Sequence, residues 1–240
     1  MSGAWHSHAR TDAGRVREHN EDAVLELADE RLWCVADGMG GHHDGAHASA
    51  LTVATLADYR ASAHRGIATA RLGELVARCH TALQRRARER GVDTVGCTLA
   101  VLTLHRGSAL ASWCGDARVY RVRRGRLLEM TRDHAVGVES DDRDRHLSIP
   151  PIEHGRAALT AAIGDGGASP RLEHAWFTLD PGDRFAICTD GLTKEASDRE
   201  ILDDTATADC VEDQVARLFG RYLERGARDN IGVIGVAADA

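Results

Sequence analysis

The sequence predicts an α+β fold, a four-layer α-β-β-α sandwich in which two mainly antiparallel sheets pack together with helix pairs outside. Short β-type segments follow one another at close intervals in the middle of the chain, with turn residues between them. Strands this close must pair antiparallel, because parallel neighbours need a long crossover. Helical patterns precede this cluster of strands and recur near the C-terminus, so helices are available to cover both outer faces.

The N-terminal half is expected to hold a hairpin and two helices. Strand patterns at 23–27 and 32–36 flank a charged turn. An Ala-rich segment predicts a helix over 43–59. Apolar residues recur at three- and four-residue spacing over 67–83, which indicates an amphipathic helix, and Gly91 is expected to end it.

The rest of the chain completes one predicted domain. Further strands are expected at 98–104, 109–114, 118–122, 127–130, 172–179, 184–188 and 231–236. A helix over 211–222 carries its apolar side chains on one face. Because no repeat or linker interrupts the pattern, we expect a single domain over 1–240 with its core at about 10–238. The charged, Pro-containing segment 135–158 predicts a flap-like surface excursion.

The overall charge excludes a basic nucleic-acid binder. The 240 residues include 30 Lys+Arg and 37 Asp+Glu, a formal net charge of −7, whereas polyanion binding needs a surplus of positive charge. No apolar run reaches the ~18 residues of a membrane span, and the N-terminus has no signal-peptide core. The six cysteines form no CxxC pair, which predicts buried free thiols. We therefore expect a cytoplasmic protein that binds neither nucleic acid nor membrane.

Acidic residues, mostly beside glycine, recur at the ends of the apolar strand patterns. They are Asp37, Asp116 and Asp190 after strands, and Asp229 and the pair Glu21-Asp22 before strands. A single Asp-Gly pair is ordinary turn chemistry. Several together favour an oxygen-only site for a hard divalent cation, because carboxylate and carbonyl oxygens suit such ions.

Motifs in a fixed order along nearly the whole chain carry a family resemblance. They occupy residues 12–23, 35–42, 96–98, 115–120, 128–134, 159–164, 182–192, 197–201 and 229–231. The set resembles the metal-dependent protein phosphatases of type 2C, which remove phosphate from phosphoserine and phosphothreonine, and in its compactness it is similar to the bacterial branch.

The resemblance implies a core of two Mn²⁺ or Mg²⁺ ions. Asp37 matches the aspartate that bridges the two ions, and Gly38 matches the residue that lends its backbone carbonyl to one of them. Asp190 and Asp229 match the ligands that complete the other ion. Paired divalent ions activate a water and neutralise the charge that develops on phosphorus. The expected reaction is therefore direct attack by a metal-bridging hydroxide.

The resemblance also implies outer ligands and a substrate-binding group. Asp22, with Glu21 beside it, matches an acidic pair that holds metal-bound water. Asp116 together with Asp190 matches a third, weaker metal site. Arg17 occupies the position of the arginine that grips the substrate phosphate. A planar guanidinium can hold two phosphate oxygens at once, which suits it to that role.

The sequence departs from the family pattern at several positions. Met39 stands where many members carry a histidine proposed as general acid, and His42 is a nearby candidate for that role. Ala161 replaces a frequent arginine, and Lys194 replaces a frequent aspartate. Substrate choice is the least transferable property, because segment 135–158 differs from the usual flap beside the cleft.

Two other kinds of catalytic site have weaker support. His43 and His47 have the four-residue spacing of a zinc site, but the glutamate of an HExxH motif is missing. Cys79 and Arg85 have the spacing of cysteine-dependent phosphatases, yet no glycine lies between them to form a phosphate-cradling loop. No GxxxxGK[ST] motif is present, so a P-loop hydrolase is unsupported.

The alternative from another class is a catalytically weak relative that acts as a phosphoprotein-binding regulatory module. Loss of the metal aspartates or of Arg17 would signal such a protein, and all of them are present. The expected partners are phosphorylated Ser/Thr proteins, which a Ser/Thr kinase would produce, and the expected state is a monomer.

Overall fold

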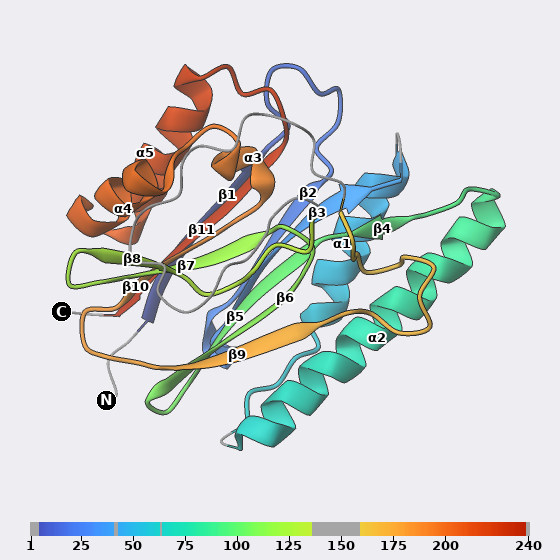
Figure 1. Cartoon of the computed structure of the whole chain (residues 1–240), viewed down its shortest axis with the longest axis horizontal. Coiled ribbons are helices and arrows are strands. Elements are labelled where there is room, and N and C mark those ends of the chain that lie inside the picture. The colour runs from blue at the N-terminus through green and yellow to red at the C-terminus, as the bar shows by residue number, and fades with distance from the viewer. Residues whose placement is uncertain (1–4, 41–42, 63, 136–158, 239–240) are drawn as a thin grey trace.

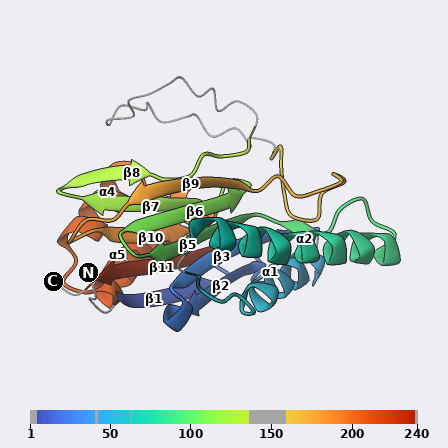
Figure 2. The same cartoon turned by 90° about the horizontal axis from the view of Figure 1, so that it is seen from below.

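A computed structural model of the chain describes residues 5–40, 43–62, 64–135 and 159–238. Its strands form two antiparallel sheets that pack face to face, with helices on both outer sides (Figures 1 and 2). The five-stranded sheet has the order β1-β11-β10-β7-β8, and the six-stranded sheet has the order β2-β3-β5-β6-β9 with β4 paired to β3. The predicted four-layer α-β-β-α sandwich is confirmed.

The elements agree closely with the predicted segments. The strands are β1 (Trp5–Asp12), β2 (Asp22–Leu27), β3 (Leu32–Met39), β4 (Gly96–Cys97), β5 (Leu99–His105), β6 (Ser108–Cys114), β7 (Arg118–Arg123), β8 (Arg126–Glu129), β9 (Glu173–Thr178), β10 (Arg184–Cys188) and β11 (Ile231–Ala238). The helices are α1 (His43–Leu56), α2 (Arg65–Arg90), α3 (Asp190–Thr193), α4 (Asp198–Thr207) and α5 (Val211–Glu224), with a 3-10 turn at Ala28–Glu30.

The two helix pairs lie on opposite sides of the sheets (Figure 1). The pair α1 and α2 covers the six-stranded sheet, and the pair α4 and α5 covers the five-stranded sheet. Helix α2 ends where the sequence indicates, because Gly91 adopts the left-handed conformation at φ 66° and its N–H bonds the last turn.

Apolar side chains from both sheets fill the layer between them. Nearly all are fully buried, among them Trp33, Val35, Leu102, Phe185, Ile187 and Ile234. Burial of each large apolar side chain contributes about 1.5–3 kcal/mol. Because this layer is tightly packed, the strands are rigid, and they fix the positions of the loops that follow them.

Four elements lie outside the predicted set: strand β1, the two-residue strand β4, the short helix α3 and helix α4. Strand β1 is polar and pairs only with β11 at the edge of its sheet, so its side chains are half-buried or exposed and lack the apolar alternation that indicates a strand. Helix α4 begins at a capping box in which Ser197 accepts from the N–H of Glu200 and the Glu200 side chain returns to the N–H of Ser197.

The cysteine prediction needs one correction. All six cysteines are free, and five are buried, but Cys210 is exposed. It occupies the position just before α5, where its sulfur accepts a hydrogen bond from the N–H of Asp213. A small polar acceptor is favoured at the start of a helix, and this capping role places Cys210 outside the core.

The predicted flap-like excursion at 135–158 lies outside the described residues except for Ala135. The residues that flank the remaining segment, Ala135 and Leu159, form an isolated antiparallel bridge. None of the helices in the described ranges has the length and apolar composition needed to cross a bilayer.

Candidate metal and phosphate site

The acidic residues singled out by the sequence meet at one end of the sandwich. Asp22 begins β2 and lies directly opposite Asp37 in the register of β2 and β3. Asp190 follows β10 as the first residue of α3. Asp229 precedes β11, and Asp116 lies in the turn between β6 and β7. Both sheets therefore contribute strand ends to the same cluster.

Asp22 is held in the interior of this cluster. Its side chain accepts a hydrogen bond of 2.6 Å from Thr189 Oγ1 at the end of β10. Its other oxygen, Oδ1, is buried and has no hydrogen-bond partner among the described residues. Burial, and then the charges of Asp190 and Asp229, raise the pKa of Asp22 to about 7.

Asp37 is a carboxyl group whose ionisation is opposed by burial and by the neighbouring carboxylates. Burial raises its pKa well above the ordinary value, and repulsion from four neighbours adds to this effect, in order from Asp22, Asp190, Asp116 and Asp229. Carboxylates that share so small a volume disfavour their common ionisation. A divalent cation placed among them would remove that cost.

Thr98 connects Asp37 to the loop that carries Asp116. Its backbone N–H donates to the Asp37 carbonyl at 2.8 Å, and its Oγ1 accepts from the Asp37 N–H at 3.2 Å. Gly115 packs on its other side at φ +101°, where an added Cβ would lie 2.7 Å from the Thr98 side chain. Asp116 therefore has a fixed place beside Asp37, and burial followed by the charge of Asp190 raises its pKa to about 7.

The glycine after Asp37 permits a close backbone approach. A Cβ on Gly38 would lie 2.0 Å from the Gly45 carbonyl oxygen in α1, so no side chain fits there. A Cβ on Gly45 would in turn lie 2.6 Å from Glu21 Oε1. The carboxylate of Glu21 thus lies against the first turn of α1, where the helix dipole favours negative charge.

Asn230 anchors the loop that carries Arg17. In the sequence this residue is marked only by its place in the pair Asp229-Asn230 before a strand, which does not predict the role. Its Oδ1 accepts from the N–H of Glu21 at 2.9 Å. Its Nδ2 donates to the carbonyls of Ala13 and His19, each at 2.9 Å. The three bonds close the loop from both sides and fix where Arg17 emerges.

Two basic side chains contact the cluster. Arg17 lies 2.8 Å from Asp229 Oδ1, and its side chain is 49% exposed. Lys194 Nζ lies 2.5 Å from Asp190 Oδ2 and 2.8 Å from Asp229 Oδ2. Burial would raise the pKa of Asp229, but the hydrogen bond and charge of Lys194, with Arg17, outweigh it and lower that pKa. Burial prevails at Asp190, whose pKa is raised.

The donor set fits a hard divalent cation. Every candidate donor is a carboxylate or backbone carbonyl oxygen, and Asp22 Oδ1 is a buried acceptor without a hydrogen-bond partner among the described residues. Within the described ranges, no three His, Cys, Asp or Glu side chains surround one point as ligands do. Binding an ion therefore requires these carboxylates to turn towards it and to change their contacts with Arg17 and Lys194.

The other candidate groups lie elsewhere or outside the described residues. His42 lies outside the described residues. Met39 is the last residue of β3, and its side chain has no ionisable group. His47 is exposed on α1. Cys79 is buried on α2, and burial raises the pKa of its thiol, which disfavours the thiolate that a cysteine nucleophile needs.

Comparisons with known proteins agree with this geometry. Residues 11–231 match the profile of the family described as protein phosphatase 2C. A curated relative, the serine/threonine protein phosphatase PstP of Mycobacterium tuberculosis (strain H37Rv), is 32% identical over 229 residues. That match covers 94% of this chain but 43% of PstP, so the chain spans less than half the length of that relative.

Solved structures resemble the whole chain. PppA, a regulatory component of T6SS in Pseudomonas aeruginosa, superposes with a TM-score of 0.88 at 35% identity and 98% coverage of both chains. The catalytic domain of PstP in complex with two manganese ions gives a TM-score of 0.81 at 28% identity, covering 98% of this chain and 99% of that one. With its ordered motifs, its two-sheet sandwich and the match over residues 11–231, the chain belongs to the protein phosphatase 2C family.

Proposed function

We propose that the chain is a protein phosphatase that hydrolyses phosphoserine and phosphothreonine with the help of Mn²⁺ or Mg²⁺. One observation carries this proposal: five aspartates from five separate strand ends gather in a single all-oxygen cluster, and a guanidinium lies at its edge. Such a cluster is costly unless cations balance it. The named relatives, which are serine/threonine phosphatases, support the substrate class.

The core ligands follow from the positions in the cluster. Asp37 and the backbone carbonyl of Gly38 would hold one ion, Asp190 and Asp229 would hold a second, and Asp37 would bridge the two. Asp116 with Asp190 would hold a third, weaker one. When bound, such ions supply an activated water as nucleophile and neutralise charge on the phosphoryl group.

The remaining roles belong to residues of the chain itself. Arg17 would bind and orient the substrate phosphate, because its guanidinium offers parallel donors and is half-exposed at the edge of the cluster. Asp22, whose Oδ2 is fixed by Thr189, would use Oδ1 with Glu21 to orient the attacking water. Thr98 and Asn230 would keep Asp37 and the Arg17 loop in register.

The oligomeric state, the cellular location, the partner kinase and the role of segment 135–158 are proposed from the family resemblance alone. We infer a single catalytic domain, monomeric and cytoplasmic, that acts on proteins phosphorylated by a Ser/Thr kinase, with segment 135–158 as a flap that contributes to substrate choice. No observation favours the alternative of a silent phosphoprotein-binding module, since the metal aspartates and Arg17 are retained.

The direct test is hydrolysis of a phosphothreonine peptide with Mn²⁺, with EDTA, and in variants of the cluster. Mn²⁺ should be required, and Asp37→Asn and Asp190→Ala should abolish turnover. Asp203→Asn is a matched control, because this aspartate is half-exposed on α4, where it pairs with Arg199 and not with the cluster. Activity that survives EDTA, or that is unchanged in the first two variants, would overturn the proposal.

A further inference from the structure

Lys194 is the only lysine in the chain. The other 29 basic residues are arginines. The single exception lies among the metal-site carboxylates, at a position where the resemblance leads one to expect an acidic side chain. An ammonium is a compact point charge with three donors, whereas a guanidinium is a planar fork, so the two groups occupy an oxygen cluster differently.

The local fold aims this ammonium at two carboxylates. Lys194 follows α3 directly, and its backbone N–H donates to the Asp190 carbonyl at 2.8 Å, so the two side chains lie on the same face one turn apart. Its Nζ contacts Asp190 Oδ2 at 2.5 Å and Asp229 Oδ2 at 2.8 Å. The ammonium thus contacts two carboxylates at once, as a bound metal ion would.

The second oxygen of Asp229 has a cation partner as well. Arg17 lies 2.8 Å from Oδ1, while Lys194 lies 2.8 Å from Oδ2. A metal ion that takes Asp229 as a ligand must therefore replace or share one of these contacts. For the Asp190 carboxylate, the basic partner found among the described residues is Lys194.

We propose that Lys194 is a built-in cation that competes with a divalent ion for the carboxylate oxygens of Asp190 and Asp229. This inference rests on the proposed function, in which these two aspartates hold an ion. Binding of the ion replaces the single positive charge of the ammonium at these oxygens with the double charge of the metal. The cost of displacing the ammonium weakens metal binding and sets the metal concentration at which the site fills.

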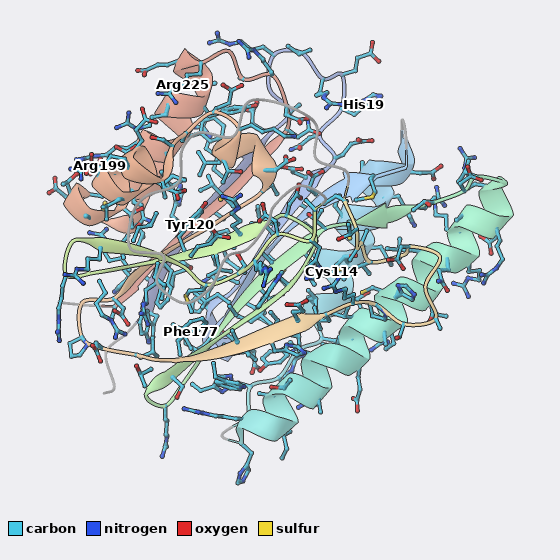
Figure 3. The ribbon with its side chains drawn as sticks, in the orientation of Figure 1. His19, Cys114, Tyr120, Phe177, Arg199 and Arg225 are labelled. Carbon is cyan, nitrogen blue, oxygen red and sulfur yellow. The ribbon has the colours of Figure 1, made fainter. Side chains whose placement is uncertain are left out.

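The first test is calorimetric titration of the protein with Mn²⁺ after removal of metal by a chelator. Lys194→Met should bind Mn²⁺ at least about ten-fold more tightly than the wild type, the scale of one lost charge-assisted contact. Lys194→Arg, which keeps the charge, should stay closer to the wild type. Arg199→Met removes an equal charge from the outer helix α4, where Figure 3 labels it, and should leave the affinity unchanged.

The titration separates failure of this inference from failure of the proposed function. Equal or weaker Mn²⁺ binding by Lys194→Met, with normal binding by the wild type, would overturn the competition while leaving the metal site intact. Absence of Mn²⁺ binding in the wild type would overturn both.

The second test uses the wild-type chain and does not depend on how any variant folds. Because Lys194 is the only lysine, reductive methylation followed by peptide mass spectrometry reports on one side chain, with the α-amino group as internal reference. Saturating Mn²⁺ should raise the labelling rate of Lys194 several-fold by releasing its Nζ from the two carboxylates. An unchanged or lower rate at saturating Mn²⁺ would overturn the proposal.

Discussion

The same strands build the layer between the two sheets and the acidic cluster at the strand ends, but the layer buries apolar side chains whereas the cluster buries carboxyl groups. Between the sheets, β3 and β10 bury the uncharged side chains of Trp33, Phe185 and Ile187, and the one polar group among these three, the Trp33 Nε1–H, has no hydrogen-bond partner in the described residues. Further along the chain, Asp37 near the end of β3 and Asp190 just after β10 join the acidic cluster, and burial raises the pKa of both. The apolar layer supplies the stability that lets mutually repelling carboxylates be held together.

Neutralising a cluster carboxylate should separate the two regions most sharply. Asp37→Asn is expected to lower turnover of a phosphothreonine peptide at least about a hundred-fold, the scale of losing one preorganised electrostatic group. Stability in EDTA should be unchanged or higher, because a buried repulsion is removed. Steady-state kinetics and urea unfolding measure the two effects, and a large loss of stability would instead give Asp37 a structural role.

Truncating the apolar layer should have the reverse effect. Phe185→Ala is expected to lower the free energy of unfolding by about 3–5 kcal/mol, because its side chain is fully buried. Mn²⁺ affinity of the folded protein should stay unchanged. Phe177→Ala, on the partly buried edge strand β9, is the matched control and should cost less (Figure 3). Equal costs would mean that the layer between the sheets is not the main source of stability.

The pH dependence of stability should depend on whether metal is bound. Burial, and then the charge of Asp190, raises the pKa of Asp116 in the folded chain to about 7, from the 3.8 of a solvent-exposed aspartate. The folded state therefore holds this proton more tightly, so the contribution of Asp116 to stability falls as pH rises through that interval and stays low above it.

The difference between the wild type and Asp116→Asn isolates this contribution. In EDTA the variant should match the wild type near pH 4 and become the more stable of the two by about pH 8. Urea unfolding across this range measures it, and saturating Mn²⁺ should remove the advantage of the variant, because a cation favours the charged carboxylate. A variant whose advantage grows as pH falls would contradict the sign.

The loop that carries Arg17 should respond to loss of its amide anchor. Asn230→Ala removes the bonds to Glu21, Ala13 and His19, so the guanidinium is less well positioned. We expect KM for a phosphopeptide to rise by about ten-fold, in keeping with loss of one or two hydrogen bonds, with a smaller change in kcat. A fall in kcat alone would place the role of Asn230 in the metal cluster instead.

Most of the fold and the composition of the cluster could be predicted from the sequence, because both leave local patterns. Alternating strands and the amphipathic helices α2 and α5 have clear periods, and Asp-Gly pairs mark where strands end. The edge strand β1 lacks such a pattern, since its stability comes from pairing with β11.

The supporting contacts could not be predicted, because they join segments far apart in the chain. Thr98 and Asn230 have motif positions but no local feature that reveals their partners. The same holds for Gly191, where a Cβ would lie 1.8 Å from the Asn230 carbonyl oxygen. In the sequence, Lys194 is notable only because it replaces a frequent aspartate. Its contacts with Asp190 and Asp229, which suggest a role in metal binding, are visible only in the structure.

If the aspartate cluster binds the divalent ions on which phosphatase activity depends, metal occupancy and turnover must change together. The most direct measurement pairs equilibrium Mn²⁺ binding with phosphothreonine-peptide hydrolysis over the same Mn²⁺ concentrations, in the wild type and in Asp190→Ala. We expect binding and turnover to rise together in the wild type and both to be lost in the variant. Turnover that is independent of Mn²⁺ occupancy, or that persists in Asp190→Ala, would contradict it.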